Sequence, residues 1–171
     1  WDKLFRVVTI KKGQYTYGPQ GTLHGSPYAP TEEEKDMVEL GFETNSDITY
    51  RLYDWGRNMP DRPLHVEKVI ETVNIPDDQN MGVDIVEKDI DGCKVAYFID
   101  KPGIFTAFRI RVDENGTFER KEFMFLFCID GEAEINGTVI KKGETIFIPC
   151  DYGTLTIKGK AEFGGMTYRN L

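Results

Sequence analysis

The residues whose types and spacing most clearly indicate a chemical role are a glycine, a proline, a second glycine and a histidine. Gly13 is followed after five residues by Pro19, and Gly21 then precedes His24 with two residues between them. Gly13 suits the hairpin turn that starts a strand, and Pro19 with Gly21 suits a tight turn at its end. Such a turn directs the next strand so that His24 projects inward, where a neutral imidazole binds a divalent metal. We therefore predict that His24 is a metal ligand.

Two arginines follow in a segment rich in polar and aromatic residues. Residues 45–51 read NSDITYR, and residues 52–57 continue as LYDWGR. On a strand, Arg51 and Tyr53 would share one face. The planar guanidinium group fits phosphate and enediol oxygens, so Arg51 and Arg57 are candidate substrate-binding residues. An ordinary exposed strand with solvated arginines is the alternative that composition leaves open.

The composition predicts a globular protein whose partners are neither nucleic acids nor membranes. Hydrophobic residues make up 40% and charged residues 29% of the 171 residues, and the net charge is -8. An acidic surface repels nucleic acids and anionic lipids, and no apolar run approaches the roughly 18 residues of a membrane helix. Cys93, Cys128 and Cys150 are widely spaced. We expect them to be buried free thiols of a cytoplasmic protein.

The segments that would position His24 and the two arginines are predicted to be strands. β-Branched and aromatic residues alternate over residues 4–17, which indicates two strands around a turn at Lys12 and Gly13. Residues 38–53 have the same character, with a turn or bulge at residues 45–47, where Asn, Ser and Asp occur.

One short helix and a second run of strands are expected further along. Apolar residues at helical spacing predict an amphipathic helix over residues 63–73, with His65 as a surface or packing residue. A polar linker follows at residues 74–80. From residue 82 to the end, short strands bounded by Gly, Asp or Asn indicate a β-sandwich or barrel.

An internal repeat relates the two parts of the chain. Residues 11–19 read KKGQYTYGP and residues 141–149 read KKGETIFIP, and each copy is followed by Gly-Thr-Leu. We interpret the copies as two related β-domains, the first only partly present. Thr156 stands where the first copy has His24, and without imidazoles the second domain is predicted to bind no metal.

The spacing that ends in His24 is the second conserved motif of cupin barrels, and a more specific resemblance extends along the chain. The blocks GTLH at residues 21–24, NSDITYR at 45–51 and LHVEK at 64–68 occur in the order typical of small bacterial class I mannose-6-phosphate isomerases. The chain resembles their C-terminal part. This resemblance implies an all-β cupin jelly roll, sandwich or barrel, that is part of a double cupin with one short helix.

The resemblance also implies a domain division and roles for the site residues. Residues 1–60 would end the first, catalytic cupin domain, 61–81 would form a helix and linker, and 82–171 a second, metal-free cupin-like domain. His24 would bind the catalytic zinc, Arg51 would stabilise the enediolate, and Arg57 would lie near the phosphate of a small sugar phosphate. The implied reaction interconverts mannose 6-phosphate and fructose 6-phosphate through a cis-enediol.

Two departures from the family pattern bear on this expectation. Gly41 occupies the place of an acidic residue, although Glu39 and Glu43 flank it on the same strand face. The other zinc ligands of the family would lie upstream of Trp1, so we expect this chain alone to be an inactive fragment. Two alternatives remain open: a non-catalytic cupin that binds a sugar or sugar phosphate, and a purely structural or interaction β-domain.

Overall fold

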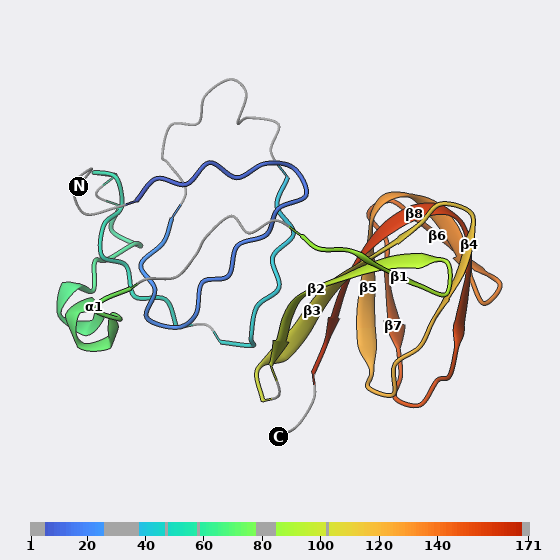
Figure 1. Cartoon of the computed structure of the whole chain (residues 1–171). Coiled ribbons are helices and arrows are strands. Elements are labelled where there is room, and N and C mark those ends of the chain that lie inside the picture. The colour runs from blue at the N-terminus through green and yellow to red at the C-terminus, as the bar shows by residue number, and fades with distance from the viewer. Residues whose placement is uncertain are drawn as a thin grey trace. The chain divides into compact units, whose positions relative to one another are not determined.

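The computed structural model describes residues 6–25, 38–46, 48–57, 59–77, 85–101 and 103–168. The chain divides into two compact units (Figure 1). Unit 1 consists of Trp1–Glu39 and Asn45–Asp84, and unit 2 consists of Leu40–Thr44 and Ile85–Leu171. The predicted division into residues 1–60, 61–81 and 82–171 stays a prediction. The two units differ from it, because residues 40–44 belong to unit 2 and unit 1 extends to Asp84.

Unit 2 contains an eight-stranded antiparallel sheet. Its strands are β1 Lys88–Ile90, β2 Cys93–Lys101, β3 Phe105–Val112, β4 Asn115–Phe118, β5 Met124–Ile135, β6 Thr138–Lys141, β7 Thr145–Ile148 and β8 Leu155–Thr167. The strand order is β1-β2-β3-β8-β5-β6, with β4 also paired to β8 and β7 to β5. Among the described residues β1 and β6 are not paired to each other, so the sheet stays open.

The two longest strands, β5 and β8, hold the unit together because each pairs with several neighbours (Figure 1). The final half of β8 pairs with β3, while its first residues pair with β4. Glycines allow these long strands to bend. Gly131 has a φ of 75°, and a Cβ there would overlap the Lys160 carbonyl of the neighbouring strand.

The interior of unit 2 is filled by apolar side chains that alternate along the strands. The largest fully buried ones are Phe108, Phe163, Ile110, Met124 and Leu126. This interior matches the predicted all-β cupin architecture, in which side chains fill a small sandwich or barrel. Cys93 and Cys128 are buried in it as free thiols, as expected. Cys150 is exposed, so the expectation of burial was wrong for that residue.

The strands predicted for the start of the chain are not formed in the described residues. The turn at Lys12 and Gly13 is confirmed, with Gln14 N–H donating to the Lys11 carbonyl at 3.0 Å. Only Tyr15 makes a bridge contact in residues 6–25, and residues 38–46 and 48–53 contain no strand. A strand needs a partner for its backbone groups, and the described part of unit 1 supplies no ladder.

The helix prediction is confirmed in a shorter form, since α1 extends over Val66–Thr72. His65 caps its start with non-helical dihedral angles, and Val73 leaves the helix in an extended conformation. Val69 is its buried residue. In the part of the chain that the structure describes, no helix is long and apolar enough to span a membrane.

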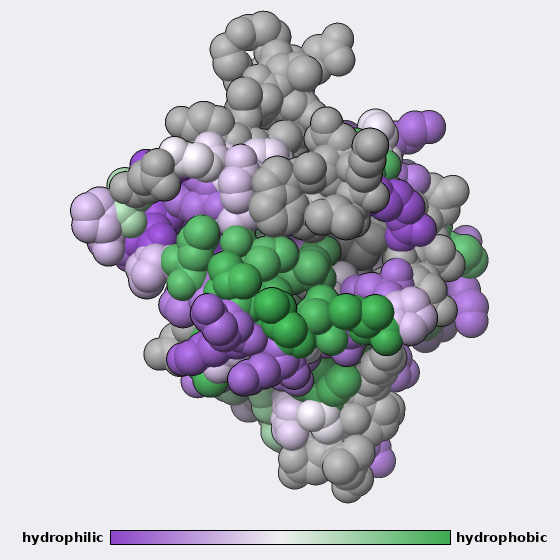
Figure 2. All heavy atoms as spheres, turned by 90° about the vertical axis from the view of Figure 1, so that its left-hand side faces the viewer, coloured by the Kyte–Doolittle hydropathy of each residue, from purple (hydrophilic) through white to green (hydrophobic). Residues whose placement is uncertain are grey.

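Unit 1 buries far fewer side chains than unit 2. Among its described residues only Val69 and Asp54 are buried. Large apolar side chains such as Val7, Ile70 and Ile75 are exposed, and Figure 2 shows apolar surface gathered on the face of the molecule that it presents. The local geometry of unit 1 therefore depends mainly on turns, one helix and polar contacts.

Candidate functional site

The turn that leads into His24 has the geometry that its sequence predicts. Gly21 has a φ of 84°, which favours glycine, and Thr22 N–H donates to the Pro19 carbonyl at 3.1 Å. The His24 ring nitrogen Nδ1 lies 2.9 Å from the Thr22 carbonyl oxygen. A carbonyl can only accept, so Nδ1 donates in this contact, and in the neutral form of the ring the lone pair is then on Nε2. The imidazole is exposed, so the prediction that His24 projects inward was wrong for the described residues, and Nε2 is accessible as a metal ligand.

The end of α1 holds this turn in place. Asn74 N–H donates to the Gly21 carbonyl at 2.9 Å, and its amide Nδ2 donates to the Gln20 carbonyl at 2.8 Å. A Cβ on Gly21 would lie 2.7 Å from the carbonyl oxygen of Thr72, so only glycine allows this close approach. The turn before His24 is therefore fixed to the C-terminal end of the helix.

The start of the same helix holds Arg51. His65 N–H donates to the Arg51 carbonyl at 2.7 Å, and Arg51 N–H donates to Nδ1 of His65 at 3.2 Å. The Arg51 side chain also reaches the Pro63 carbonyl at 3.5 Å. His65, predicted as a surface or packing residue, thus positions the Arg51 backbone. A seven-residue helix is about 10 Å long, so α1 anchors both predicted site residues at its two ends.

Asp54 gathers three guanidinium groups in unit 1. Its Oδ1 lies 2.5 Å from Nη2 of Arg57, 3.3 Å from Nη2 of Arg62 and 3.7 Å from Nε of Arg51. Asp54 is only 6% exposed. The hydrogen bond from Arg62, followed by that from Arg57, lowers the pKa of the Asp54 carboxyl, although burial opposes this shift. The structure therefore brings Arg51 and Arg57 together on one ionised carboxylate.

Two tight turns create this arginine cluster. Arg57 N–H donates to the Asp54 carbonyl at 3.0 Å, and Trp55 between them has a φ of 53°. A second turn follows, in which Arg62 N–H donates to the Met59 carbonyl at 3.0 Å. Asp54 and Arg62 are not among the site residues that the sequence predicted. The spacing of an aspartate and an arginine three residues apart around Trp-Gly was the available signal.

The described residues fit a zinc ion at one coordination position. His24 presents Nε2, and the buried hydroxyl of Thr22 beside it finds no hydrogen-bond partner in the part of the chain that the structure describes. No group of three His, Cys, Asp or Glu side chains with metal-binding geometry occurs among those residues. Glu39 and Glu43 are exposed. The described residues would thus supply one zinc ligand, His24, and a complete zinc site would need further ligands.

The second copy of the repeat differs from the first at the ligand position. Thr156, which aligns with His24, is exposed on β8, whereas its neighbours Leu155 and Ile157 are fully buried in the core. The aligned position of unit 2 therefore points away from the interior, and apolar side chains occupy the space where an inward-facing ligand would lie.

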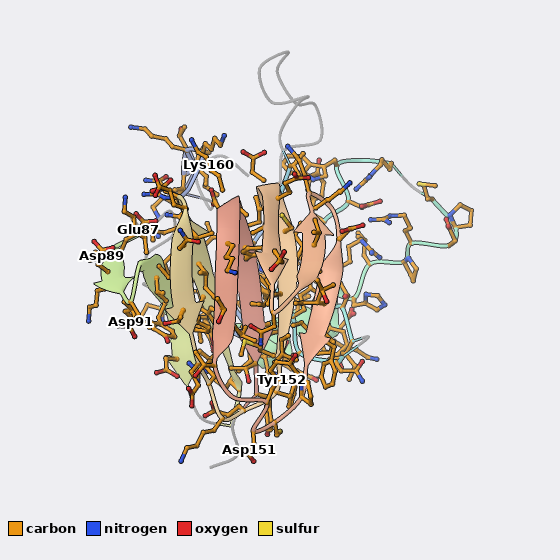
Figure 3. The ribbon with its side chains drawn as sticks, turned by 90° about the vertical axis from the view of Figure 1, so that its right-hand side faces the viewer. Glu87, Asp89, Asp91, Asp151, Tyr152 and Lys160 are labelled. Atoms are coloured by element: carbon orange, nitrogen blue, oxygen red, sulfur yellow. The ribbon has the colours of Figure 1, made fainter. Side chains whose placement is uncertain are left out.

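Unit 2 also has an open hollow of ≈ 300 Å³. Its lining comprises Ile90, Asp91, Tyr97, Thr117, Phe118, Glu119 and Thr154. Figure 3 shows Glu87, Asp89 and Asp91 on the side of the sheet that carries β1, with Asp151 and Tyr152 near one end. The hollow contains none of the predicted site residues, and its carboxylates make it unsuited to an anionic ligand.

The chain is similar to known mannose-6-phosphate isomerases. The family described as "Mannose-6-phosphate isomerase, cupin domain" matches residues 97–164. The chain is 29% identical over 170 residues to the mannose-6-phosphate isomerase ManA of Bacillus subtilis, covering 95% of this chain and 51% of that protein. It is 28% identical over 171 residues to the probable mannose-6-phosphate isomerase GmuF of the same organism, with the same coverage.

A solved structure agrees with the fold. The mannose 6-phosphate isomerase from Bacillus subtilis superposes with a TM-score of 0.61 at 23% identity, covering 71% of this chain and 41% of that one. The chain spans about half the length of the curated relatives it matches. The resemblance drawn from the GTLH, NSDITYR and LHVEK blocks is thus confirmed, and residues 97–164 match the model of the cupin domain of mannose-6-phosphate isomerases.

Proposed function

We propose that the chain is the C-terminal part of a zinc-dependent mannose-6-phosphate isomerase, which interconverts mannose 6-phosphate and fructose 6-phosphate. The observation that most supports this proposal is the position of Arg51, whose backbone N–H and carbonyl both form hydrogen bonds with His65. It occurs in a chain that matches relatives named mannose-6-phosphate isomerase over 95% of its length. Each relative's name describes that protein, and the activity is our proposal for this one.

The proposed reaction moves a proton between C1 and C2 of the sugar phosphate through a cis-enediol. Removal of the C2 proton of mannose 6-phosphate leaves negative charge on the enediolate oxygens, and return of a proton to C1 gives fructose 6-phosphate. The Arg51 guanidinium would donate hydrogen bonds to those oxygens as the charge develops. Arg57 would bind the phosphate group and so orient the sugar for the reaction.

Nε2 of His24 would hold the zinc ion, with the remaining ligands supplied from outside the described residues. Bound zinc would supply Lewis-acid polarisation of the sugar oxygens. The contribution of this chain is then to orient the imidazole through the Thr22 carbonyl, in the manner of an outer-shell partner. A cytoplasmic location is part of the proposal, supported by three free cysteines.

A coupled assay of mannose 6-phosphate isomerisation by the complete protein, with and without zinc, tests this function. We expect turnover that is lost on chelation and restored by zinc. Arg51→Lys should lower kcat by roughly 100-fold, the order seen when a donor to a developing oxyanion is removed. Arg111→Lys, a change of the same kind in unit 2, should leave kcat unchanged. Absence of turnover in the zinc-loaded protein would refute the proposal.

Elemental analysis provides a readout that does not depend on activity. His24→Ala should reduce the zinc content of the purified complete protein, because one ligand is removed. The isolated 171-residue chain should show no isomerase activity. Binding of fructose 6-phosphate without any turnover would instead favour a non-catalytic sugar-phosphate cupin.

A further inference from the structure

His65 and Arg51 form a reciprocal pair of hydrogen bonds between the start of α1 and the segment that precedes it. His65 N–H donates to the Arg51 carbonyl at 2.7 Å, and Nδ1 of the His65 ring accepts from Arg51 N–H at 3.2 Å. The Arg51 side chain also donates to the Pro63 carbonyl at 3.5 Å. One residue thus holds the peptide groups on both sides of Arg51, and one of its two bonds depends on the protonation state of a ring nitrogen.

The two histidines of the chain use Nδ1 in opposite ways. Nδ1 of His24 lies 2.9 Å from the Thr22 carbonyl oxygen and donates to it, which both a neutral and a protonated imidazole can do. Nδ1 of His65 faces the backbone N–H of Arg51, which can only donate, so this nitrogen must keep its lone pair. Protonation of His65 would place two donors against each other and break the bond to Arg51.

Four side chains among the described residues influence a positive charge on His65. The Tyr50 ring, whose centroid lies 6.0 Å from that of the His65 ring, attracts a cation, and Glu67 in the first turn of α1 also does. Arg51 repels it, as does Lys68, whose Nζ lies 5.3 Å from the centroid of the same Tyr50 ring. These charge effects oppose one another. The bond from Arg51 N–H, which only the neutral ring can accept, is the contact that distinguishes the two states.

We infer that His65 is a pH-sensitive positioning residue, which holds the Arg51 backbone only while its imidazole is neutral. Imidazole side chains change charge between about pH 5 and 8, so acidification in this range would release the N–H of Arg51. His65 is half-buried, and protons of the solvent therefore reach it without unfolding. The role of Arg51 in isomerisation rests on the proposed function, whereas the dependence of its backbone position on His65 rests on the hydrogen bonds.

The pH dependence of kcat for mannose 6-phosphate, measured with the complete protein, tests this inference. His65→Asn keeps an acceptor in place of Nδ1, because Oδ1 of asparagine is the same number of bonds from Cβ, but it has no group that titrates. At about pH 8 its kcat should lie within roughly threefold of the wild type, and its loss of kcat on acidification to about pH 6 should be several-fold smaller. His24 and the substrate phosphate titrate in both proteins, so they cancel in the comparison.

His65→Gln is the matched control, because its amide extends one bond further and its Oε1 takes the place of Nε2 instead of Nδ1. At about pH 8 it should lower kcat roughly tenfold, as expected for the loss of one hydrogen bond, with little change in KM. Its kcat should approach the wild type in acid, where His65 itself loses the bond. Asparagine is favoured at a helix N-cap, so His65→Asn should fold, and thermal unfolding checks all the variants. Equal acid losses in the wild type and His65→Asn would overturn the inference.

The backbone amide resonance of Arg51, in complete protein labelled with heavy nitrogen at arginine, provides a readout that does not depend on turnover. Its chemical shift should move on acidification of the wild type and stay in place in His65→Asn. Movement of equal size in both proteins would overturn the role of His65 even if the protein isomerises mannose 6-phosphate. A shift that depends on His65 in a protein without turnover would support the positioning of Arg51 while refuting the isomerase.

Discussion

Backbone carbonyl and amide groups, rather than side-chain packing, orient the predicted site residues. The direction of the His24 ring follows from its hydrogen bond to Thr22, and the position of Arg51 follows from two hydrogen bonds with His65. Asp54 acts differently, because its carboxylate directs three side chains at once. Each group thus has an identifiable partner that sets its geometry, as a preorganised site requires.

The cysteines provide a residue-scale prediction. Burial raises the pKa of the Cys93 and Cys128 thiols above the ordinary value of 9.0, whereas Cys150 is exposed. Since the thiolate is the nucleophile, iodoacetamide at about pH 8 should label Cys150 alone in the folded chain. Mass spectrometry of tryptic peptides measures the labelling, and unfolding in guanidinium should expose all three cysteines. Comparable labelling of Cys93 in the folded chain would contradict the described packing.

The same pKa shifts have a defined sign for stability. Their folded-state pKa values lie above the unfolded ones, so both thiols stay protonated in the folded state to higher pH. The contribution of the two thiols to the free energy of unfolding is fully present below about pH 9 and is lost as the pH rises through their folded-state pKa values.

At the scale of elements, the two copies of the repeat form the same turn. Gln14 N–H donates to the Lys11 carbonyl and the Gln14 side chain accepts from Lys11 N–H. Glu144 makes the same two bonds with Lys141. The turn glycines have φ values of 86° and 88°. The copies differ in the next element, because the second copy continues into β7 while the described residues of the first form no strand.

The bend in β5 gives an element-scale prediction that two glycines can separate. Gly131 and Gly137 both have positive φ, at 75° and 88°, but only at Gly131 would a Cβ overlap a neighbouring carbonyl, that of Lys160; at Gly137 it would meet open space. Gly137→Ala should cost about 1 kcal/mol for its left-handed conformation. Gly131→Ala should cost about 1–3 kcal/mol more because of overlap with β8. Urea unfolding followed by circular dichroism measures both, and equal losses would show that the close approach is absent.

At the scale of the whole molecule, the order of the chain and its compact units do not coincide. Residues 40–44 come from the middle of the segment that builds unit 1, yet they belong to unit 2. There Leu40 and Phe42 pack on the backbone of Gly164 in β8, where a Cβ would lie 2.5 Å from Leu40 and 3.1 Å from Phe42. The absence of a side chain at Gly164 therefore leaves room for residues 40–44 to pack against β8.

Because residues 40–44 pack against β8, we expect the stability of unit 2 to depend on residues outside its sheet. Phe42 is half-buried, so Phe42→Ala should destabilise unit 2 by about 1–2 kcal/mol, roughly half the value for a fully buried aromatic ring. Val38→Ala, a control four residues away at a side chain that is 93% exposed, should change stability by less than about 0.5 kcal/mol. Thermal unfolding monitored by circular dichroism of the sheet compares the two. An equal effect of both variants would place residues 40–44 outside the fold of unit 2.

Local features of this protein follow from residues close together in the sequence. The turn at Lys12 and Gly13, the helix that begins beside His65, and the alternating strands of unit 2 all depend on neighbours within a few positions, so their patterns predicted them. The family blocks likewise predicted His24 and Arg51 as site residues without coordinates, and their roles stay predictions. The tertiary structure decided whether a strand-forming segment finds a partner, that Cys150 is exposed, and that Arg62 joins Arg51 on Asp54. Those outcomes depend on the pairing of distant backbone groups and on the meeting of charges across turns, which no local pattern encodes.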